Sequence, residues 1–138
     1  MMGIRFKDRA LEWWLATCTF GFGLFIAAPG HSMDGDAFLL LILWMKEFTW
    51  GLFFIMTGSL HLTALTINGR AWWTPFLRAG MTAANFTVYF IFGYGFWLLD
   101  HNSTAVWSYG VMISSAAAIC FYRASSDAAI AWRLRRDP

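Results

Sequence analysis

The chain has 138 residues, of which 59% are hydrophobic and only 13% are charged. Soluble domains carry charge on about a quarter of their residues, so this composition excludes an ordinary soluble protein. The formal charge of +2 is too small to indicate a nucleic-acid-binding protein. We therefore expect an all-α membrane protein whose long apolar segments are transmembrane helices.

The first apolar segment, about 11–28, is long enough to cross about 30 Å of hydrocarbon. Trp13 and Trp14 mark one interface, and Pro29-Gly30 ends the helix. A signal peptide is the alternative, because a basic start precedes the apolar run and the small residues Ala27-Ala28 stand at its end. The run exceeds a typical signal-peptide core and three more apolar segments follow, so we predict a first transmembrane helix.

The region 37–67 contains a nine-residue apolar run, then Lys46-Glu47, and then a second apolar run that begins at Phe48. One long tilted span would bury both charges at a cost of several kcal/mol. We therefore predict a short helix at the outer interface, followed by a span over about 48–67. Glu47 then lies in the first turn of that span, where a carboxylate interacts favourably with the helix dipole.

The third span is predicted over about 79–99 and the fourth over about 105–122. Trp72 and Trp73, in the loop before the third span, are expected to lie at the inner interface. Residues 123–138 form a basic cytoplasmic tail, in which 128–132 are expected to form a short amphipathic helix on the inner leaflet. The whole chain, 1–138, is predicted to be one four-helix transmembrane domain.

The basic residues are distributed unequally about these spans. Nine of the ten Lys and Arg residues fall on one side, and only Lys46 falls on the other. The positive-inside bias places the basic side in the cytoplasm, which gives both termini a cytoplasmic location. The bacterial inner membrane is the predicted location, and its anionic inner-leaflet lipids are expected to contact this basic side.

Depth along antiparallel helices predicts a polar layer in the cytoplasmic half of the bundle. His61 lies six residues before the inner end of the second span, and Asn85 lies six residues after the inner start of the third. At 1.5 Å per residue the two side chains are at a similar depth, and Thr17 and Ser115 fall within about one turn of it. The layer is either interhelical hydrogen bonding or a proton-sensitive or ligand-binding site, and we favour the first.

Small residues recur at four-residue intervals on two predicted helices and indicate faces of close helix packing. They are Gly80 and Ala84 on the third span, and Gly110, Ser114 and Ala118 on the fourth. Packing within one chain and packing between copies both fit this pattern. Cys18 and Cys120 form no metal-binding motif and are expected to be free thiols.

Motifs for metal or cofactor binding are absent from the sequence. The predicted outer loops contain His31, Asp34, Asp36, Glu47, Asp100 and His101, but their spacing matches no ligand pattern, so we expect solvated loops, no metal and no cofactor. No Ser/His/Asp set, HExxH motif or phosphate-binding glycine loop is present, and we predict that the protein is not an enzyme.

Transport is a weaker alternative. Small multidrug transporters have four helices and a membrane-embedded glutamate in the first. Here Glu12 is close to the predicted interface, and the one-sided distribution of basic residues argues against the dual topology of that family.

Several segments together form a recognisable pattern, at 9–14, 21–30, 47–51, 65–70, 74–78 and 122–128. The pattern resembles small four-span membrane proteins of unassigned function that tailed bacteriophages and proteobacterial prophages encode. An arginine is usual in that pattern where this chain has His61. The matching residues are turn, cap and interface signals, so the resemblance implies a context rather than a chemical mechanism.

A phage context implies a holin-like protein that acts by self-association in the host membrane. Such proteins need apolar helices, a few polar groups within the membrane and contacts between copies. The first alternative is a structural or assembly subunit of a virion or larger membrane complex. The second is a superinfection-exclusion protein, which blocks the entry of a competing genome.

Overall fold

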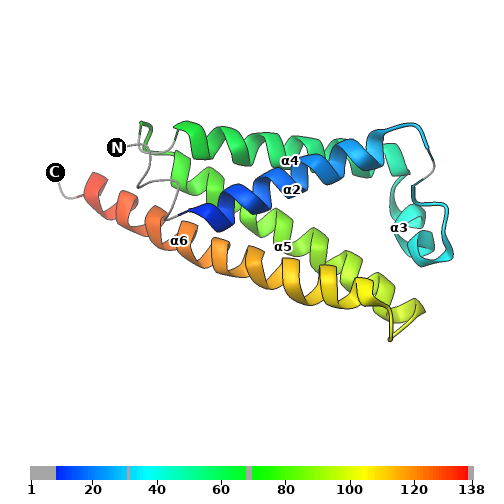
Figure 1. The fold of residues 1–138 in the computed structure, drawn as a ribbon. Coiled ribbons are helices and arrows are strands. Elements are labelled where there is room, and N and C mark those ends of the chain that lie inside the picture. Colours follow the sequence, from blue (N-terminus) through cyan, green and yellow to red (C-terminus); the bar gives the residue numbers. More distant parts are fainter. Residues whose placement is uncertain (1–8, 31, 68–69, 137–138) are drawn as a thin grey trace.

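The computed structural model describes residues 9–30, 32–67 and 70–136, and every regular element within them is a helix. Three helices are long and apolar enough to cross a membrane: α2 (Ala10–Ala27), α4 (Glu47–Ile67) and α5 (Thr74–Leu99). They correspond to the first three predicted spans, although α5 begins five residues earlier than expected. The all-helical fold with three candidate membrane spans is therefore confirmed (Figure 1).

The fourth predicted span is part of a longer rod. It consists of a π-helix, η2 (Val106–Ile113), and α6 (Ser114–Arg136). The rod continues past Tyr122 as α6, so residues 128–132 belong to this rod and form no separate tail helix. Residues 123–136 contain neither glycine nor proline and are rich in alanine, which favours continuation of the helix. This continuation places Asp127 beside α5.

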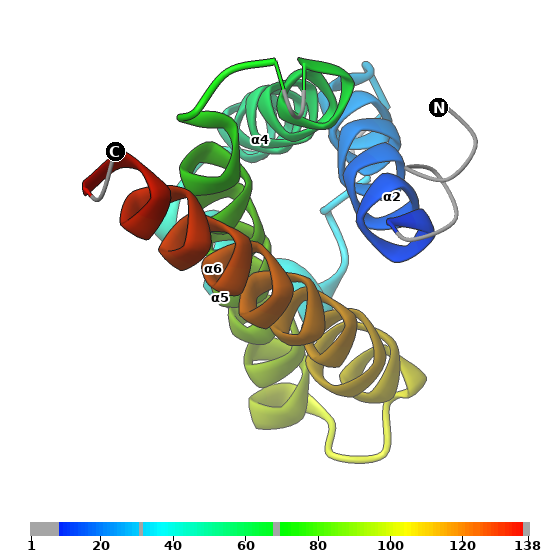
Figure 2. The ribbon, with the colours of Figure 1, turned by 90° about the vertical axis from the view of Figure 1, so that its left-hand side faces the viewer.

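The helices form two antiparallel pairs, α2 with α4 and α5 with the η2–α6 rod (Figures 1 and 2). Contacts between α4 and α5 join the pairs, whereas α2 and α6 contact each other much less. We call the end where α2 begins and α6 ends the basic end, because Arg9, Arg70 and Arg133–Arg136 lie there. Lys46 lies at the opposite end, which we call the α3 end.

A short helix precedes α4, as predicted. It comprises a 3-10 turn, η1 (Asp36–Phe38), and α3 (Leu39–Trp44), and it ends where Met45 adopts an extended backbone. The indole Nε1 of Trp50 donates a hydrogen bond of 2.9 Å to the backbone oxygen of buried Leu41. This bond attaches α3 to α4.

Glu47 also has a role that the helix dipole alone did not predict. Its Oε1 accepts hydrogen bonds from the backbone N–H groups of Ser32 and Met33, at 2.7 and 3.2 Å, and from the Ser32 hydroxyl. The carboxylate therefore attaches the segment after α2 to the start of α4.

Replacing Trp50 with Phe is expected to lower the free energy of unfolding by about 1 kcal/mol, because the hydrogen bond to Leu41 is lost. Hydrogen exchange in α3 is expected to accelerate more than exchange in α5. Trp44→Phe is the matched control, since Trp44 is 70% exposed. Equal hydrogen-exchange rates in α3 of the Trp50→Phe and Trp44→Phe variants would show that this bond does not attach α3 to α4.

Glycines allow the close approach of both helix pairs. A Cβ on Gly93 of α5 would lie 2.2 Å from Cα of Gly110 in η2. Between α2 and α4, a Cβ on Gly23 would lie 2.5 Å from the backbone nitrogen of Ile55. In both pairs glycine is required because no side-chain carbon fits between the backbones.

The small residues that were predicted to pack between helices differ in burial. Gly110 packs against Gly93, and Ser114 is buried. Ala84 and Ala118 are half-buried, whereas Gly80 is exposed and a Cβ there would meet nothing within 4 Å. Gly80 lies outside the stripe of buried residues on α5, which explains its exposure.

Candidate functional site

The interior of the bundle changes from charged to aromatic along its length. One stripe of α5 shows the change, with buried residues spaced alternately four and three apart: Arg78, Thr82, Asn85, Tyr89, Phe92 and Phe96. On α2, buried Glu12 and Thr19 face the same interior. Charges therefore lie at the basic end, a neutral polar layer follows, and aromatic rings fill the half nearer α3.

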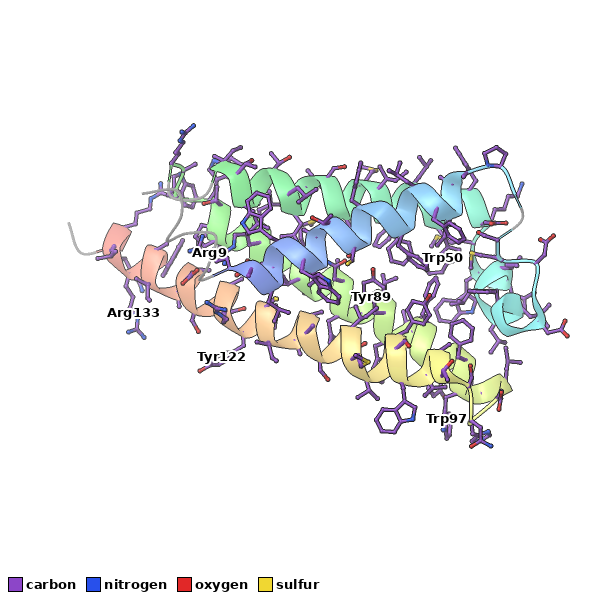
Figure 3. The ribbon with its side chains drawn as sticks, in the orientation of Figure 1. Arg9, Trp50, Tyr89, Trp97, Tyr122 and Arg133 are labelled. Atoms are coloured by element: carbon purple, nitrogen blue, oxygen red, sulfur yellow. The ribbon has the colours of Figure 1, made fainter. Side chains whose placement is uncertain are left out.

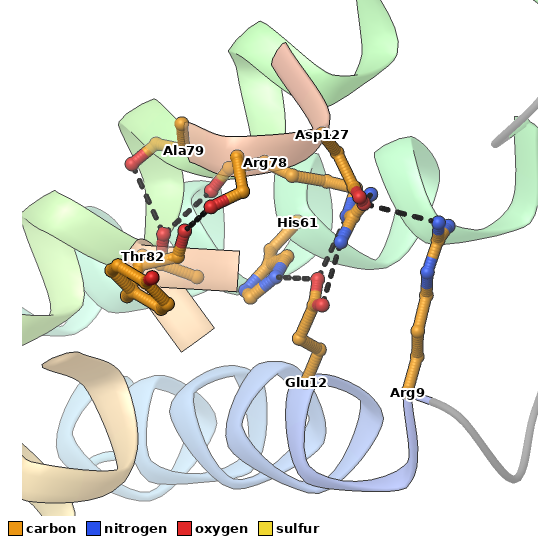
Figure 4. Close-up of polar contacts among 9 residues, drawn as sticks. Arg9, Glu12, His61, Arg78, Ala79, Thr82 and Asp127 are labelled. Atoms are coloured by element: carbon orange, nitrogen blue, oxygen red, sulfur yellow. Dashed lines mark hydrogen bonds and ion pairs between the residues drawn. The ribbon is translucent and has the colours of Figure 1, made fainter. Parts of the chain in front are cut away.

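Arg78 and Glu12 form a bidentate ion pair between α5 and α2 (Figure 4). Nε of Arg78 donates to Oε2 of Glu12 at 2.7 Å, and Nη2 donates to Oε1 at 2.6 Å. The exposed fractions of the two side chains are 0% and 1%. Parallel charge-assisted hydrogen bonds of this kind are strong and directional, so the pair fixes α2 relative to α5.

Asp127 of α6 extends the pair into a network. Its Oδ2 accepts a hydrogen bond from Nη1 of Arg78 at 3.0 Å and another from Nη2 of Arg9 at 3.2 Å. Two carboxylates and two guanidinium groups balance in charge. Burial lowers the pKa of Arg9, nearby Arg78 lowers it further, and Asp127 and Glu12 oppose both effects. The network joins the basic ends of α2, α5 and α6.

His61 of α4 lies beside this network and is fully buried. Its Nε2 is 3.9 Å from Oε2 of Glu12, which is longer than a hydrogen bond. Neither ring nitrogen has a hydrogen-bond partner among the described residues. A movement of about 1 Å would bring the imidazole into hydrogen-bonding range of the carboxylate. Helices α2, α4, α5 and α6 therefore each contribute a side chain to the charged site or to its edge.

A neutral polar contact lies about two helical turns deeper in the bundle. The Thr19 hydroxyl donates to Oδ1 of Asn85 at 3.1 Å and lies 3.3 Å from the Tyr89 hydroxyl. The Asn85 Nδ2 has no partner among the described residues. This contact joins α2 to α5 and separates the charged site from the aromatic half.

Tyr109 of the π-helix lies at the centre of the aromatic half. Its ring stacks on Tyr89 and Phe96, with interplanar angles of 11° and 14°. Phe22 of α2 also packs against it, with ring centroids 5.7 Å apart. The Ser114 hydroxyl donates to the Tyr109 backbone oxygen at 2.7 Å, in addition to the backbone N–H of Ser114, which donates to the same oxygen. Figure 3 shows Tyr89 and Trp50 in this region.

The structure places the four residues of the predicted polar layer in two different environments. His61 and Asn85 are both buried, but they contact different partners, Glu12 and Thr19. Thr17 and Ser115 are exposed. Thr17 is two residues from Thr19, about 200° around the helix, so it lies on the opposite face of α2. Ser115 is likewise displaced from the buried stripe of α6, to which Ser114 belongs.

Sequence reasoning missed the charged site because it placed Arg78 in a loop and Glu12 at an interface. One signal was available: Pro75 lies in the first turn of α5, where proline is favoured. A helix that starts there contains Arg78 and brings it to the same end of the bundle as Glu12. Opposite charges at one depth in a membrane bundle are expected to pair.

The described residues contain no group of three metal-ligating side chains. Asp34, Asp36, Asp100 and His101 are exposed, and His31 lies outside the described residues. Cys18 is half-buried and Cys120 is buried, and both are free thiols. Within the charged network both carboxylates are bound by arginine, so its chemistry suits holding helices together.

No protein-family model, curated protein or solved structure matches this chain. The features of the molecule that bear on function are its buried network, the distribution of its basic residues and its exposed apolar side chains.

Proposed function

We propose that the chain is a four-span protein of the bacterial cytoplasmic membrane, with both termini in the cytoplasm. It acts by association with copies of itself, in a holin-like manner, rather than by catalysis. The observation that supports this proposal is the inverted distribution of polarity. Charged and polar groups of the bundle pair inside it, and large apolar side chains point outward.

The outward apolar surface extends over every long helix. Its members include Phe25, Met56, Phe90, Trp107 and Met112, each at least 52% exposed. In water such a surface would drive aggregation, whereas lipid tails or a protein partner cover it at no comparable cost. The surface is therefore suited to lipid and to lateral contact with other membrane helices.

A fourth crossing by the η2–α6 rod completes the proposed topology. Residues 106–122 contain no charged side chain, and the rod is about 46 Å long at 1.5 Å per residue. That length matches the full thickness of a bilayer with its headgroup regions. The positive-inside bias then orients the basic end toward the cytoplasm, with Lys46 outside.

Contacts between copies would differ from those within the bundle. The glycines at 23, 51, 58, 93 and 110 already bring helices together inside one chain. Contact between copies is therefore left to aromatic and aliphatic side chains and to exposed small residues such as Gly21 and Gly80. A structural subunit of a larger membrane complex is the second candidate. Exposed Leu43 and Trp44, on a helix too short to cross the membrane, favour it.

Induced expression in a bacterium tests the proposal. We expect cross-linking to trap discrete oligomers and membrane potential to collapse at a defined time, together with release of a co-expressed cytoplasmic cell-wall hydrolase. An unrelated four-span protein at the same level controls for overexpression. A monomer that leaves growth and potential unchanged would overturn the holin-like function. Co-purification of a stoichiometric partner would instead support the second candidate.

A further inference from the structure

The last turns of α6 and the first turn of α5 meet at one level of the bundle. The Trp72 and Phe76 rings lie 6.1 Å apart, and Phe76 packs edge-on against Trp132 at 6.5 Å. These contacts hold the end of α6 beside the start of α5. Because tryptophan is enriched at membrane interfaces, this aromatic group marks the headgroup level of the basic end.

Arg135 is held in place at this level. Its guanidinium carbon lies 4.2 Å from the centre of the Trp72 ring, which is a cation–π contact. Stacking occupies one face of the guanidinium and leaves its N–H edges available as donors. Trp132, Arg135 and Arg136 line an open hollow beside this contact. The hollow therefore presents one oriented guanidinium, a second arginine and an indole.

Asp127 does not neutralise these arginines. Asp127 is bound by Arg78 and Arg9, and neither Arg135 nor Arg136 pairs with a carboxylate among the described residues. Exposed aromatic rings lie beside the arginines, because Arg135 stacks on Trp72 and Trp132 lines the hollow, and the two rings are 56% and 52% exposed. Adjacent arginines and exposed tryptophan rings match the boundary between headgroups and acyl chains.

We propose that this hollow, formed by Trp132, Arg135 and Arg136 with Trp72 behind it, binds the phosphate of an anionic phospholipid. The guanidinium of Arg135 recognises the phosphate oxygens through paired N–H donors, and Arg136 adds charge. The exposed Trp72 and Trp132 rings beside the hollow contact the start of the acyl chains, which favours a lipid over free phosphate. The site deepens the proposed function, because it rests on the basic end facing a bilayer, but it does not depend on self-association.

Retention of lipid by purified protein tests the site. The protein is reconstituted into nanodiscs that contain phosphatidylethanolamine and phosphatidylglycerol, and the lipid that stays bound is counted by native mass spectrometry. We expect enrichment of phosphatidylglycerol, reduced about fivefold by Arg135→Gln or by Arg136→Gln. Trp72→Leu is expected to reduce it as well, because Arg135 loses its stacking partner.

Arg70→Gln is the matched control, because Arg70 is an exposed arginine at the same end but outside the hollow. It is expected to change the enrichment less than twofold. Equal retention by all four variants would overturn the site, as would full displacement of the lipid by inorganic phosphate. Oligomer formation is measured on the same preparations, so failure of the lipid site is distinguishable from failure of the proposed function.

Discussion

Replacing Arg78 with Met is expected to lower the free energy of unfolding by about 3–5 kcal/mol. The change removes the paired hydrogen bonds to Glu12 and the bond to Asp127, and it leaves Glu12 as a buried charge without its arginine. Unfolding in mixed micelles, followed by tryptophan fluorescence, measures the loss. Glu12→Leu alone is expected to have a comparable effect, because buried Arg78 then loses both hydrogen bonds to its carboxylate partner.

The double variant Glu12→Leu/Arg78→Met measures the interaction energy between the two residues. It is expected to recover much of the loss, since two apolar side chains of similar size replace the buried charges and Asp127 keeps Arg9. Losses that simply add in the double variant would contradict a direct interaction of Arg78 with Glu12.

Replacing Gly93 with Ala is expected to lower the free energy of unfolding by about 1–3 kcal/mol. The added Cβ would lie 2.2 Å from Cα of Gly110 and 2.5 Å from its nitrogen, so two backbones must separate. Separation would also disturb the stacking of Tyr109 on Tyr89 and Phe96. Near-ultraviolet circular dichroism of these rings is expected to weaken along with stability.

Gly80→Ala is the matched control on the same helix. A Cβ at Gly80 meets nothing within 4 Å, and alanine is favoured over glycine within helices by about 0.5–1 kcal/mol. We therefore expect no loss of stability, or a small gain. Equal destabilisation at both positions would show that the close approach of α5 to η2 does not determine the effect.

The charged site lies where burying ions costs least. Arg78 and Glu12 are close to the starts of their helices, and Asp127 and Arg9 of the same network are 39% and 22% exposed. Ions near an interface keep part of their solvation, while ions deep in hydrocarbon must lose it. The same reasoning explains why Thr19 and Asn85, which are neutral, occupy the next level of the interior.

The lengths of the apolar runs and the residues that interrupt them predicted most helix boundaries, but they did not predict which face of each helix is buried. Pro29-Gly30 and the Lys46-Glu47 interruption marked the ends of apolar runs, and α2, α3 and α4 follow them closely. Depth alone predicts Thr17, although Thr19 lies on the stripe of α2 that contains Glu12 and Gly23. Depth and helical phase together identify the buried threonine.

Neither the π-helix nor the pairing of Arg78 with Asp127 has a local signal in the sequence. The π-helix at Val106–Ile113 is a tertiary adaptation that places Gly110 against Gly93 and Tyr109 among the aromatic rings. The extension of α6 past Tyr122 depends on helix propensity, but its consequence, the bond from Arg78 to Asp127, depends on packing. Pairing of residues 49 positions apart cannot be deduced from either helix by itself.

The four-span topology is tested most directly by the accessibility of single cysteines in intact cells. Cys18 and Cys120 are first replaced with Ala, and one cysteine is then introduced at Lys46, Arg70 or Arg133. A membrane-impermeant maleimide is expected to label the Lys46→Cys variant from outside and the other two only after permeabilisation. If the maleimide labelled the Arg133→Cys variant from outside and left the Arg70→Cys variant unlabelled, the η2–α6 rod would not return across the membrane. That result would contradict the four-span topology.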